Sequence, residues 1–455
     1  MKTWHGQQFL AVAAVLAVGV FPNAMAANYY AARNGQTPSA PYTSWESAAF
    51  HIQDAVNAAT TNDTVWVGAG RYTVPPNATN YIGTNVVFVN KPMTLRSSNG
   101  VPESTIIDGS GTNRGLAVYY TFSSTSLFVL DGFTISNCWA TNMGGGILYN
   151  ADNLASWTGV VQNCVICYNA VGWGTNAGSF RGTTGARGGG FGSYNWNVDG
   201  YGLMLSNCVF RGNRADDTGG SGGGIHREGY GKVVIVDCLM ESNSAVNGGA
   251  CSINMPPTMF ERCQIRNNYA TTRGGGLYLG STASKVRNCL IYNNTAGSGG
   301  GICSFYAPVQ DIENCTIVSN RGSVGAGVIQ RFYNQGAGIR ICNSIIYSNY
   351  NNSDIYSEGS QTNMTNIWCT NICVYSTNYL LSAGNTGNIT NNPRFATFAG
   401  QNFRLAPDSP CVNSGFKQDW MTNAVDLDGR QRIRYGTVDM GAYELIYGGT
   451  IYRFH

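Results

Sequence analysis

Acidic, basic and imidazole side chains gather in one short stretch of this 455-residue sequence. A pair of carboxyl groups can serve as general acid and general base in glycoside hydrolysis. A histidine or another basic side chain can remove a proton beside a uronate carboxylate, as a lyase requires. The stretch therefore offers candidate catalytic residues for a polysaccharide lyase or a glycosidase, namely Asp216, Asp217, His226, Arg227 and Lys232.

The same stretch also fits an ordinary turn followed by a strand. Asp216 and Asp217 are adjacent at a turn, where aspartate is common because its side chain can bond to nearby backbone. His226 begins the next strand, and adjacent residues of a strand point to opposite faces. No second acidic cluster lies one repeat away. Turn aspartates and a solvated histidine are therefore the favoured interpretation.

A long insertion supplies candidate binding residues. Cys164 and Cys208 are 44 residues apart, whereas the most regular repeats are 26 residues long. A loop at 171–201 must therefore leave the repeats, and long loops on a rigid scaffold often bind ligands. Aromatic faces beside arginines suit sugar rings and acidic groups, although they suit packing of the loop on the scaffold equally well. The expected binding residues are Trp173, Arg181, Arg187, Tyr194, Trp196 and Tyr201.

Three aspartates near the end of the chain are the candidates for a metal site. The segment Asp426-Leu-Asp428-Gly429 is similar to part of a calcium loop, but the later oxygen ligands of an EF-hand are absent. Because Asp-Gly is first a turn signal, we expect a closing turn and no bound cofactor. The alternative is a calcium ion held with the help of Asp439.

The repeats that position these residues are predicted to be strands. Successive units share a glycine cluster, a short apolar run, a cysteine and then an asparagine. A cysteine and the apolar residue two places later, as in Cys289 and Ile291, lie on one face of a strand. A unit of about 25 residues with two or three short strands predicts one coil of a parallel β-helix, which advances about 4.8 Å per coil.

Like residues should stack on like in such a rod. The asparagine column from Asn137 to Asn349 is expected to pass amide hydrogen bonds from coil to coil. The cysteines of the repeats are expected to be small fillers with free thiols, because in-register neighbours place their Cβ atoms about 4.8 Å apart, beyond the roughly 3.5 to 4.5 Å of a disulfide. Cys369 and Cys373 lie outside that column and are the predicted disulfide candidates of an exported chain.

The ends of the chain are predicted to export and to cap the rod. Residues 1–26 combine an early lysine, an apolar core and an Ala-Met-Ala site, which predicts a secretory signal peptide. Residues 27–80 are expected to form an N-terminal cap and first strand. We expect the β-helix at 81–415 and an irregular C-terminal cap and tail at 416–455. The cap should contain a short helix that buries Ala48, Ile52, Ala55, Val56 and Ala59.

The composition agrees with one elongated exported domain. Charged residues make up 11% of the chain, against roughly 25% in typical globular proteins. Its 59 glycines exceed the usual share. A net charge of +3 gives no reason to expect nucleic acid or an anionic membrane as a partner. No stretch beyond the signal approaches a transmembrane helix.

Several motifs carry a resemblance to known families. The segments GGGI, GGGL, FRGN, IRNN and IYNN resemble the repeats of the chlamydial polymorphic membrane protein family. More broadly, the chain resembles right-handed parallel β-helix proteins of the pectin-lyase-like superfamily. The segments 42–72, 409–415 and 426–444 are similar to the ends of bacterial surface or secreted proteins within that group. The resemblance implies an all-β, right-handed parallel β-helix at the surface of a bacterium or in its medium.

The predicted function is binding rather than catalysis. A complete scaffold without a complete catalytic set indicates an exported β-helix protein that binds polysaccharide or other cell-surface material through its aromatic loop. The multi-carboxylate set of a polygalacturonase-like glycosidase is not recognisable in the sequence. The alternative is a polysaccharide lyase or glycoside hydrolase that acts on uronate-containing polymers through residues 216–232.

Overall fold

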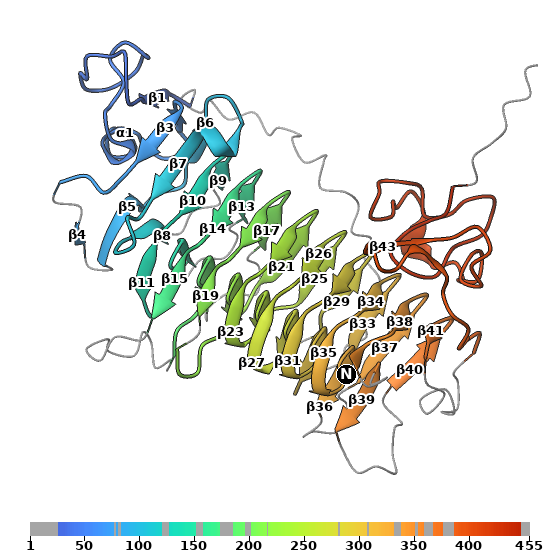
Figure 1. Cartoon of the computed structure of the whole chain (residues 1–455). Helices are drawn as coiled ribbons and strands as arrows, with labels where there is room; N and C mark the ends of the chain where they lie inside the picture. Colours follow the sequence, from blue (N-terminus) through green and yellow to red (C-terminus); the bar gives the residue numbers. More distant parts are fainter. Residues whose placement is uncertain are drawn as a thin grey trace, which may run out of the picture.

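The repeating units fold into the coils of a right-handed parallel β-helix (Figure 1). The computed structural model describes residues 26–76, 79–80, 83–120, 127–151, 158–172, 185–195, 202–215, 217–280, 283–306, 309–331, 338–350, 354–358, 367–375 and 386–446. These residues form one α-helix, α1 (Ile52–Ala58), and strands β1 to β43, so the predicted all-β class is confirmed.

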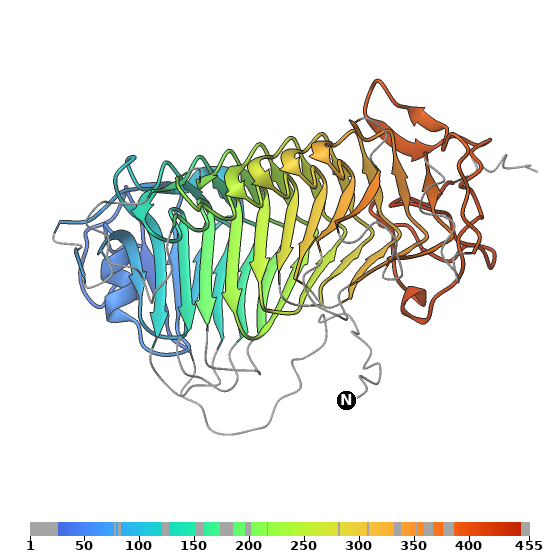
Figure 2. The ribbon, with the colours of Figure 1, turned by 90° about the horizontal axis from the view of Figure 1, so that it is seen from below.

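Each coil contributes strands to four sheets, here called sheets A to D in chain order. In one regular coil, β25, β26, β27 and β28 follow one another and belong to sheets A, B, C and D. Strands of the same sheet pair in parallel with the coil before and the coil after, except that β4 and β5 are antiparallel. Viewed from below, the coils line up as one rod, with helix α1 at one end and the C-terminal cap at the other (Figure 2).

Sheet A has twelve strands and sheet B has eleven. The strands of sheet A are β1 (Asn28–Ala31), β2 (Thr64–Val67), β6 (Thr94–Ser97), β9 (Phe128–Asp131), β13 (Thr158–Gln162), β17 (Gly202–Ser206), β21 (Lys232–Val236), β25 (Thr258–Glu261), β29 (Lys285–Arg287), β33 (Gln310–Glu313), β37 (Ile339–Cys342) and β40 (Ile367–Thr370). The strands of sheet B are β3 (Gly70–Tyr72), β7 (Thr105–Asp108), β10 (Thr134–Ser136), β14 (Val165–Cys167), β18 (Val209–Arg211), β22 (Leu239–Glu241), β26 (Gln264–Arg266), β30 (Leu290–Tyr292), β34 (Thr316–Val318), β38 (Ile345–Tyr347) and β41 (Cys373–Val374).

Sheet C has seven strands and sheet D has eleven. The strands of sheet C are β11 (Trp139–Thr141), β15 (Ala170–Gly172), β19 (Arg214–Ala215), β23 (Ser244–Asn247), β27 (Tyr269–Arg273), β31 (Thr295–Ser298) and β35 (Arg321–Val324). The strands of sheet D are β4 (Thr79–Asn80), β5 (Gly83–Val89), β8 (Arg114–Tyr120), β12 (Ile147–Ala151), β16 (Phe191–Asn195), β20 (Ile225–Gly229), β24 (Cys251–Asn254), β28 (Leu277–Gly280), β32 (Ile302–Phe305), β36 (Val328–Arg331) and β39 (Ile355–Glu358).

The asparagine column runs through the turn between sheets B and C, as the sequence predicted. The backbone N–H and Nδ2 of Asn268 both donate to Oδ1 of Asn294, at 3.0 and 2.9 Å, and Oδ1 of Asn268 accepts the same two bonds from Asn243. The first member is not Asn137 but Cys138, whose backbone N–H donates to Asn169. A shift of one residue there exchanges the inward and outward positions.

The cysteines of the repeats face the interior at the turn between sheets A and B. Cys263, Cys289 and Cys315 are fully buried, which fits the predicted role as small fillers. Sγ of Cys289 donates to the carbonyl of Arg287 at 3.0 Å and accepts the backbone N–H of Cys263 at 3.4 Å. The column thus supplies its neighbours with both apolar contact and hydrogen bonds.

Caps close both ends of the rod (Figure 1). Helix α1 lies at the N-terminal end, and the five residues predicted for its buried face have at most 2% of their surface exposed. Strand β1 pairs with β2 before the coils begin, so the rod starts one strand earlier than predicted. At the other end, β42 (Phe395–Thr397) and β43 (Asn402–Leu405) form a separate antiparallel pair, so the C-terminal cap begins before the predicted boundary at 416. Two 3₁₀ helices complete the described elements, η1 (Pro102–Ser104) and η4 (Asp419–Met421).

Candidate functional site

The outer face of sheet D brings His226 together with residues from the coil before it and the coil after it. Strand β20 alternates, so Ile225 and Arg227 face inward while His226 and Glu228 face outward. Strand β16 aligns Tyr194 with Glu228, and β24 aligns Asn254 with Glu228. Because successive coils stack in register, residues far apart in sequence lie side by side on this face.

His226, Glu228 and Arg187 form a close polar cluster. Nε2 of His226 lies 3.5 Å from Oε2 of Glu228 and 3.3 Å from Nη1 of Arg187. Arg187 and Glu228 also form an ion pair through Nη1 and Oε2, and Nδ2 of Asn254 donates to Oε1 of Glu228 at 3.3 Å. The carboxylate therefore meets a guanidinium, an amide and an imidazole at once.

Burial and charge set the protonation states of this cluster. Burial lowers the pKa of His226 below its ordinary value, because a charged imidazolium loses hydration there, and the nearby Arg187 adds to the shift. Burial alone disfavours the ionised form of Glu228, but the contacts with His226, Arg187 and Asn254 outweigh it and lower the pKa of this carboxyl. A neutral imidazole beside a carboxylate is the expected state at pH 7. Nδ1 of His226 is buried and has no hydrogen-bond partner among the described residues.

A second cluster on the same face combines arginine with aromatic rings. The guanidinium of Arg273 lies 4.7 Å from the centre of the Phe305 ring, and that of Arg331 lies 6.0 Å away. The rings of Tyr278 and Tyr306 lie 5.8 and 4.4 Å from that of Phe305. Tyr306 is 38% exposed, so one edge of this aromatic–arginine cluster is open to solvent.

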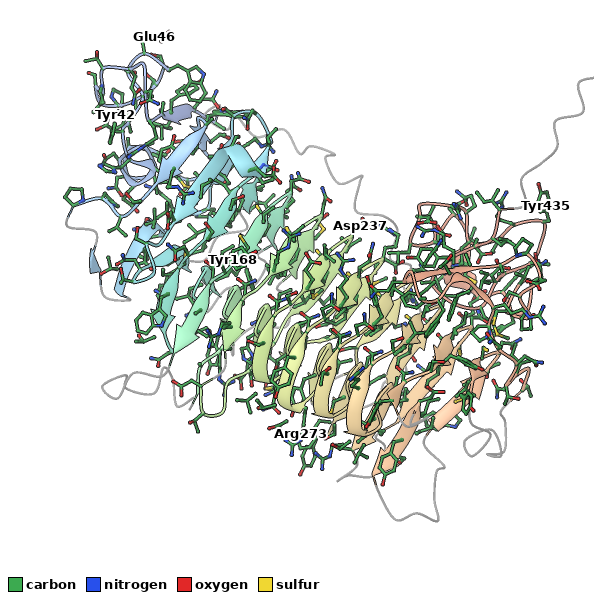
Figure 3. All side chains as sticks on the ribbon, in the orientation of Figure 1. Tyr42, Glu46, Tyr168, Asp237, Arg273 and Tyr435 are labelled. Atoms are coloured by element: carbon green, nitrogen blue, oxygen red, sulfur yellow. The ribbon has the colours of Figure 1, made fainter. Side chains whose placement is uncertain are left out.

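Arg187 and Arg273 occupy the same column at the corner between sheets C and D. Backbone bridges and strand pairing link Arg187 to Ser221, then to Asn247, and then to Arg273. Three coils therefore separate the two arginines, about 14 Å along the rod. Figure 3 labels Arg273 at the lower edge of the rod, where this corner runs. Each guanidinium contacts residues of sheet D in the next coil. Among the described residues, the guanidinium of Arg187 is paired with a carboxylate and that of Arg273 is not.

The structure separates the four predicted catalytic residues that it describes. Arg227 faces the interior of the rod, where it is fully buried and donates to the carbonyls of Glu228 and Tyr230. Lys232 is exposed at the start of β21, which belongs to sheet A. Of the four predicted catalytic residues that the structure describes, His226 alone lies in the polar cluster. The prediction of Arg227 as a catalytic residue is therefore wrong, since alternation along β20 turns it away from His226.

Asp217 lies in a turn after β19, and the backbone N–H of Gly220 donates to its carbonyl at 2.7 Å. Oδ1 of Asp217 accepts the backbone N–H of Thr218 at 2.7 Å, as in an ordinary aspartate turn. Asp216 lies outside the described residues. The turn interpretation of Asp217 is thus confirmed.

The predicted loop at 171–201 is shorter than expected. Strand β16 occupies part of that range and pairs with β12 and β20, so it belongs to the rod. Tyr194 is 3% exposed and packs with Ala117, Met143 and Leu148, so its prediction as a ligand-binding residue is wrong. Arg187 lies in the polar cluster, although its guanidinium is already paired with Glu228. The other predicted binding residues lie outside the described part of the chain, namely Trp173, Arg181, Trp196 and Tyr201.

The three predicted calcium ligands are occupied by protein donors. Asp426 accepts the backbone N–H groups of Asp428, Arg430 and Glu444 at 2.7 to 2.9 Å, which confirms the predicted turn. The carboxylate of Asp428 forms an ion pair with Arg404 at 2.5 Å. No group of three histidine, cysteine or acidic side chains suited to a metal ion occurs among the described residues. The three aspartates therefore do not form one ligand set.

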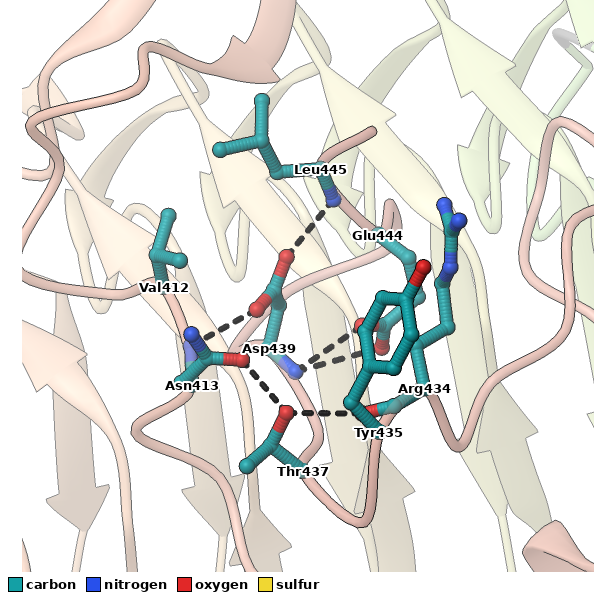
Figure 4. Close-up of a pocket in the computed structure, with 8 residues that line it drawn as sticks. All are labelled: Val412, Asn413, Arg434, Tyr435, Thr437, Asp439, Glu444 and Leu445. Atoms are coloured by element: carbon teal, nitrogen blue, oxygen red, sulfur yellow. Dashed lines mark hydrogen bonds between the residues drawn. The ribbon is translucent and has the colours of Figure 1, made fainter. Parts of the chain in front are cut away.

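Asp439 instead lines a cavity of about 220 Å³ in the C-terminal cap (Figure 4). Its carboxylate accepts the backbone N–H groups of Asn413 and Leu445, each at 2.7 Å. The backbone N–H of Asp439 donates to Glu444, and burial raises the pKa of both carboxyl groups. These bonds hold the segments of the cap together, which is a structural role.

Sequence reasoning missed most of the residues that gather on sheet D. Glu228 is two places beyond His226 on one strand, and that spacing alone places the two on the same face. Asn254 is aligned with Glu228 in the next coil, so the strand register predicts that the two lie side by side. Arg273, Tyr278 and Phe305 come from three different strands, so only the pairing between coils reveals their contact.

Solved structures with similar folds include proteins whose names state an action on polysaccharides. The crystal structure of pectate lyase Pel9A is similar over 92% of this chain and 96% of its own, with 13% identity and a TM-score of 0.53. The A-module of mannuronan C-5 epimerase AlgE6 from Azotobacter vinelandii covers 75% of this chain and 95% of its own, with 13% identity and a TM-score of 0.36. Pectin methylesterase from Aspergillus niger covers 76% of this chain and 89% of its own, with 11% identity and a TM-score of 0.32.

The likeness to pectate lyase Pel9A defines the class of fold. The match to pectate lyase Pel9A extends over nearly the whole of both chains, so this chain has a pectin-lyase-like parallel β-helix fold. No protein-family model matches the sequence, and no curated protein matches it either. Among the described residues, the structure contains no helix long and apolar enough to span a membrane. Because one fold hosts many activities, function must be argued from the residues on sheet D.

Proposed function

We propose that this chain is an exported protein that binds an acidic polysaccharide along the outer face of sheet D. The observation that carries the proposal is Arg273, stacked over Phe305 with no carboxylate partner among the described residues. Its Nε is buried and lacks a hydrogen-bond partner among those residues. A buried donor without an acceptor costs free energy, and a carboxylate or sulfate group of a ligand would satisfy it.

The neighbouring rings suit the rest of such a ligand. Aromatic faces stack on the apolar faces of sugar rings, and arginine holds carboxylates through parallel N–H groups. Phe305, Tyr278 and Tyr306 provide the rings, and Arg331 provides a second guanidinium on the same ring. The names of the structural neighbours, pectate lyase among them, support a polysaccharide as the class of ligand.

A binding measurement on matched variants tests this proposal. We expect wild-type protein to bind polygalacturonate or alginate and to bind dextran, a neutral polymer, much more weakly. Arg273→Ala should weaken binding by about tenfold, because it removes a cation–π contact and a charge-assisted bond together worth about 1 to 2 kcal/mol. Isothermal titration calorimetry gives both dissociation constants.

The matched control is Arg321→Ala. Arg321 is an exposed arginine of sheet C, so its removal changes the net charge by the same amount as the removal of Arg273. We expect the control to bind as the wild type does, provided that both variants melt at the wild-type temperature. An equal loss of affinity in the two variants would show that only the net charge of the protein matters, and it would overturn the proposal.

The second candidate function is elimination at a uronate, and the His226 cluster favours it. With its proton on Nε2 facing Glu228, a neutral His226 presents the lone pair of Nδ1, which has no partner among the described residues. Such a nitrogen could take the proton beside the carboxylate while the bond from the ring carbon to the glycosidic oxygen breaks. A carbon–carbon double bond then forms in the sugar, and the leaving oxygen takes a proton from water. Incubation with uronate polymers while following ultraviolet absorbance decides the matter. Absorbance that rises with wild-type protein and not with His226→Ala would establish a lyase, whereas binding without this rise favours the first function.

A further inference from the structure

The cysteines of the interior column are poorly placed for disulfide bonds. Cys263, Cys289 and Cys315 lie on successive coils in the same position, about 4.8 Å apart along the rod. Disulfides need Cβ atoms roughly 3.5 to 4.5 Å apart. Their sulfurs are also engaged with backbone groups, as in the bond from Sγ of Cys315 to the carbonyl of Val286 at 3.3 Å. This column is therefore stable as free thiols.

The two disulfide candidates named from the sequence, Cys369 and Cys373, lie on opposite sides of the wall of the rod. Cys369 pairs with Ile341 in sheet A and belongs to the interior core. Cys373 pairs with Ile345 in sheet B and packs outside, against the C-terminal cap. Their side chains lie in different clusters, so these two candidates do not pair with each other.

Cys373 has a different cysteine beside it. Cys411, which lies in the C-terminal cap, shares a buried cluster with Cys373, Ile345, Leu405 and Met440, and both cysteines are fully buried. The neighbouring Cys411 thiol and burial together raise the pKa of Cys373. The sulfurs are not joined in the structure.

Hydrogen bonds hold the segments around both cysteines, and no strand register keeps the two apart. Sγ of Cys373 donates to the carbonyl of Asn391 at 3.2 Å. The backbone of Cys411 is held by Ser409 and Met440, through bonds of 3.1 and 3.0 Å. Because Cys411 belongs to the cap and not to an adjacent in-register strand, the spacing of about 4.8 Å between coils does not hold the two Cβ atoms apart.

We propose that Cys373 and Cys411 are the disulfide-forming pair of this protein, and that their bond fastens the C-terminal cap to the last coil of the rod. The oxidant is a small disulfide such as oxidised glutathione. Each cysteine gives up its proton, the new S–S bond forms, and the two electrons reduce the glutathione disulfide to two thiols. Because both sulfurs are buried in the folded chain, the exchange takes place before the cap closes.

Oxidative refolding of the full chain tests this pairing. Reduced, unfolded protein is refolded with oxidised and reduced glutathione, and the remaining thiols are alkylated before digestion with trypsin. Cys411 is the single cysteine of the tryptic peptide 405–417, and Cys373 lies in peptide 341–394. We expect these two peptides to be cross-linked, with fragmentation assigning the bond to Cys373, and the cysteines of the column to be alkylated.

Two variants and a melting measurement separate this bond from other outcomes. The cross-link should persist in Cys369→Ser and disappear in Cys411→Ser. Addition of a reductant should lower the melting temperature of the oxidised wild type and leave that of Cys411→Ser unchanged. Complete alkylation of the refolded wild type, or a bond from peptide 405–417 to Cys342 or Cys369, would overturn the proposal even if a variant failed to fold.

Discussion

The asparagine column predicts a large and local loss of stability when one member is removed. In Asn268→Ala, the backbone N–H of Asn243 loses its acceptor, Oδ1 of Asn268, and the carbonyl of Met240 loses a donor at 2.9 Å. Both groups are buried in the turn between sheets B and C. Leaving a buried polar group unsatisfied costs about 1 to 3 kcal/mol, so with the cavity we expect a loss of about 3 to 5 kcal/mol.

The neighbouring residue supplies the control for this prediction. Asn267 precedes Asn268, is exposed and has a φ of 56°. Glycine adopts this left-handed conformation without strain, so Asn267→Gly preserves the backbone and removes no buried hydrogen bond. Guanidinium unfolding followed by far-ultraviolet circular dichroism should show a much lower midpoint for Asn268→Ala than for the control. Similar midpoints for the two variants would contradict the claim that the amide column holds adjacent coils together.

Two further predictions concern buried groups of sheet A and the glycine turns. Burial raises the pKa of Glu261 from 4.5 to about 7. The protonated carboxyl therefore stabilises the fold fully below pH 4.5, and this stabilisation is lost as the pH rises through 7. Glu261→Gln should remove up to about 3 kcal/mol of the pH-dependent loss of stability, measured as the difference in unfolding free energy between wild type and variant at pH 5 and at pH 8. A Cβ on Gly275 would lie 2.5 Å from the carbonyl oxygen of Thr295, whereas one on Gly280 would meet nothing closer than 3.2 Å. Gly275→Ala should therefore lower the melting temperature far more than Gly280→Ala, and equal shifts would contradict the close approach of the coils.

The rod itself was predictable because its repeat is local. A period of 26 residues with cysteine and isoleucine two places apart requires strands that stack, and stacking places asparagine over asparagine. The coil before the regular ones was misaligned by one residue, since Cys138 takes the place that Asn137 was expected to fill. Irregular coils weaken the periodic signal, and a single-residue shift then reverses which side chains face inward.

The clusters on sheet D were only partly predictable, because they join residues from different coils. His226 was identified from its chemical type, but its partner Arg187 lies 39 residues earlier and is brought close by the register across an irregular coil. The contact between Cys373 and Cys411 depends on how the cap folds back on sheet B. The sequences around Cys373 and Cys411 do not follow the 26-residue repeat. Their spacing along the chain therefore could not predict that the two cysteines lie together.

Hydrogen-exchange mass spectrometry with and without polygalacturonate tests the proposed binding face most directly. We expect the ligand to slow exchange in β28 and β32 and at the corner that carries Arg273, because those backbone groups lie beneath the aromatic–arginine cluster. Exchange in β11, which lies at the far end of sheet C from β27, should stay unchanged. Protection confined to another sheet or to the C-terminal cap, or none at a saturating ligand concentration, would contradict binding on sheet D.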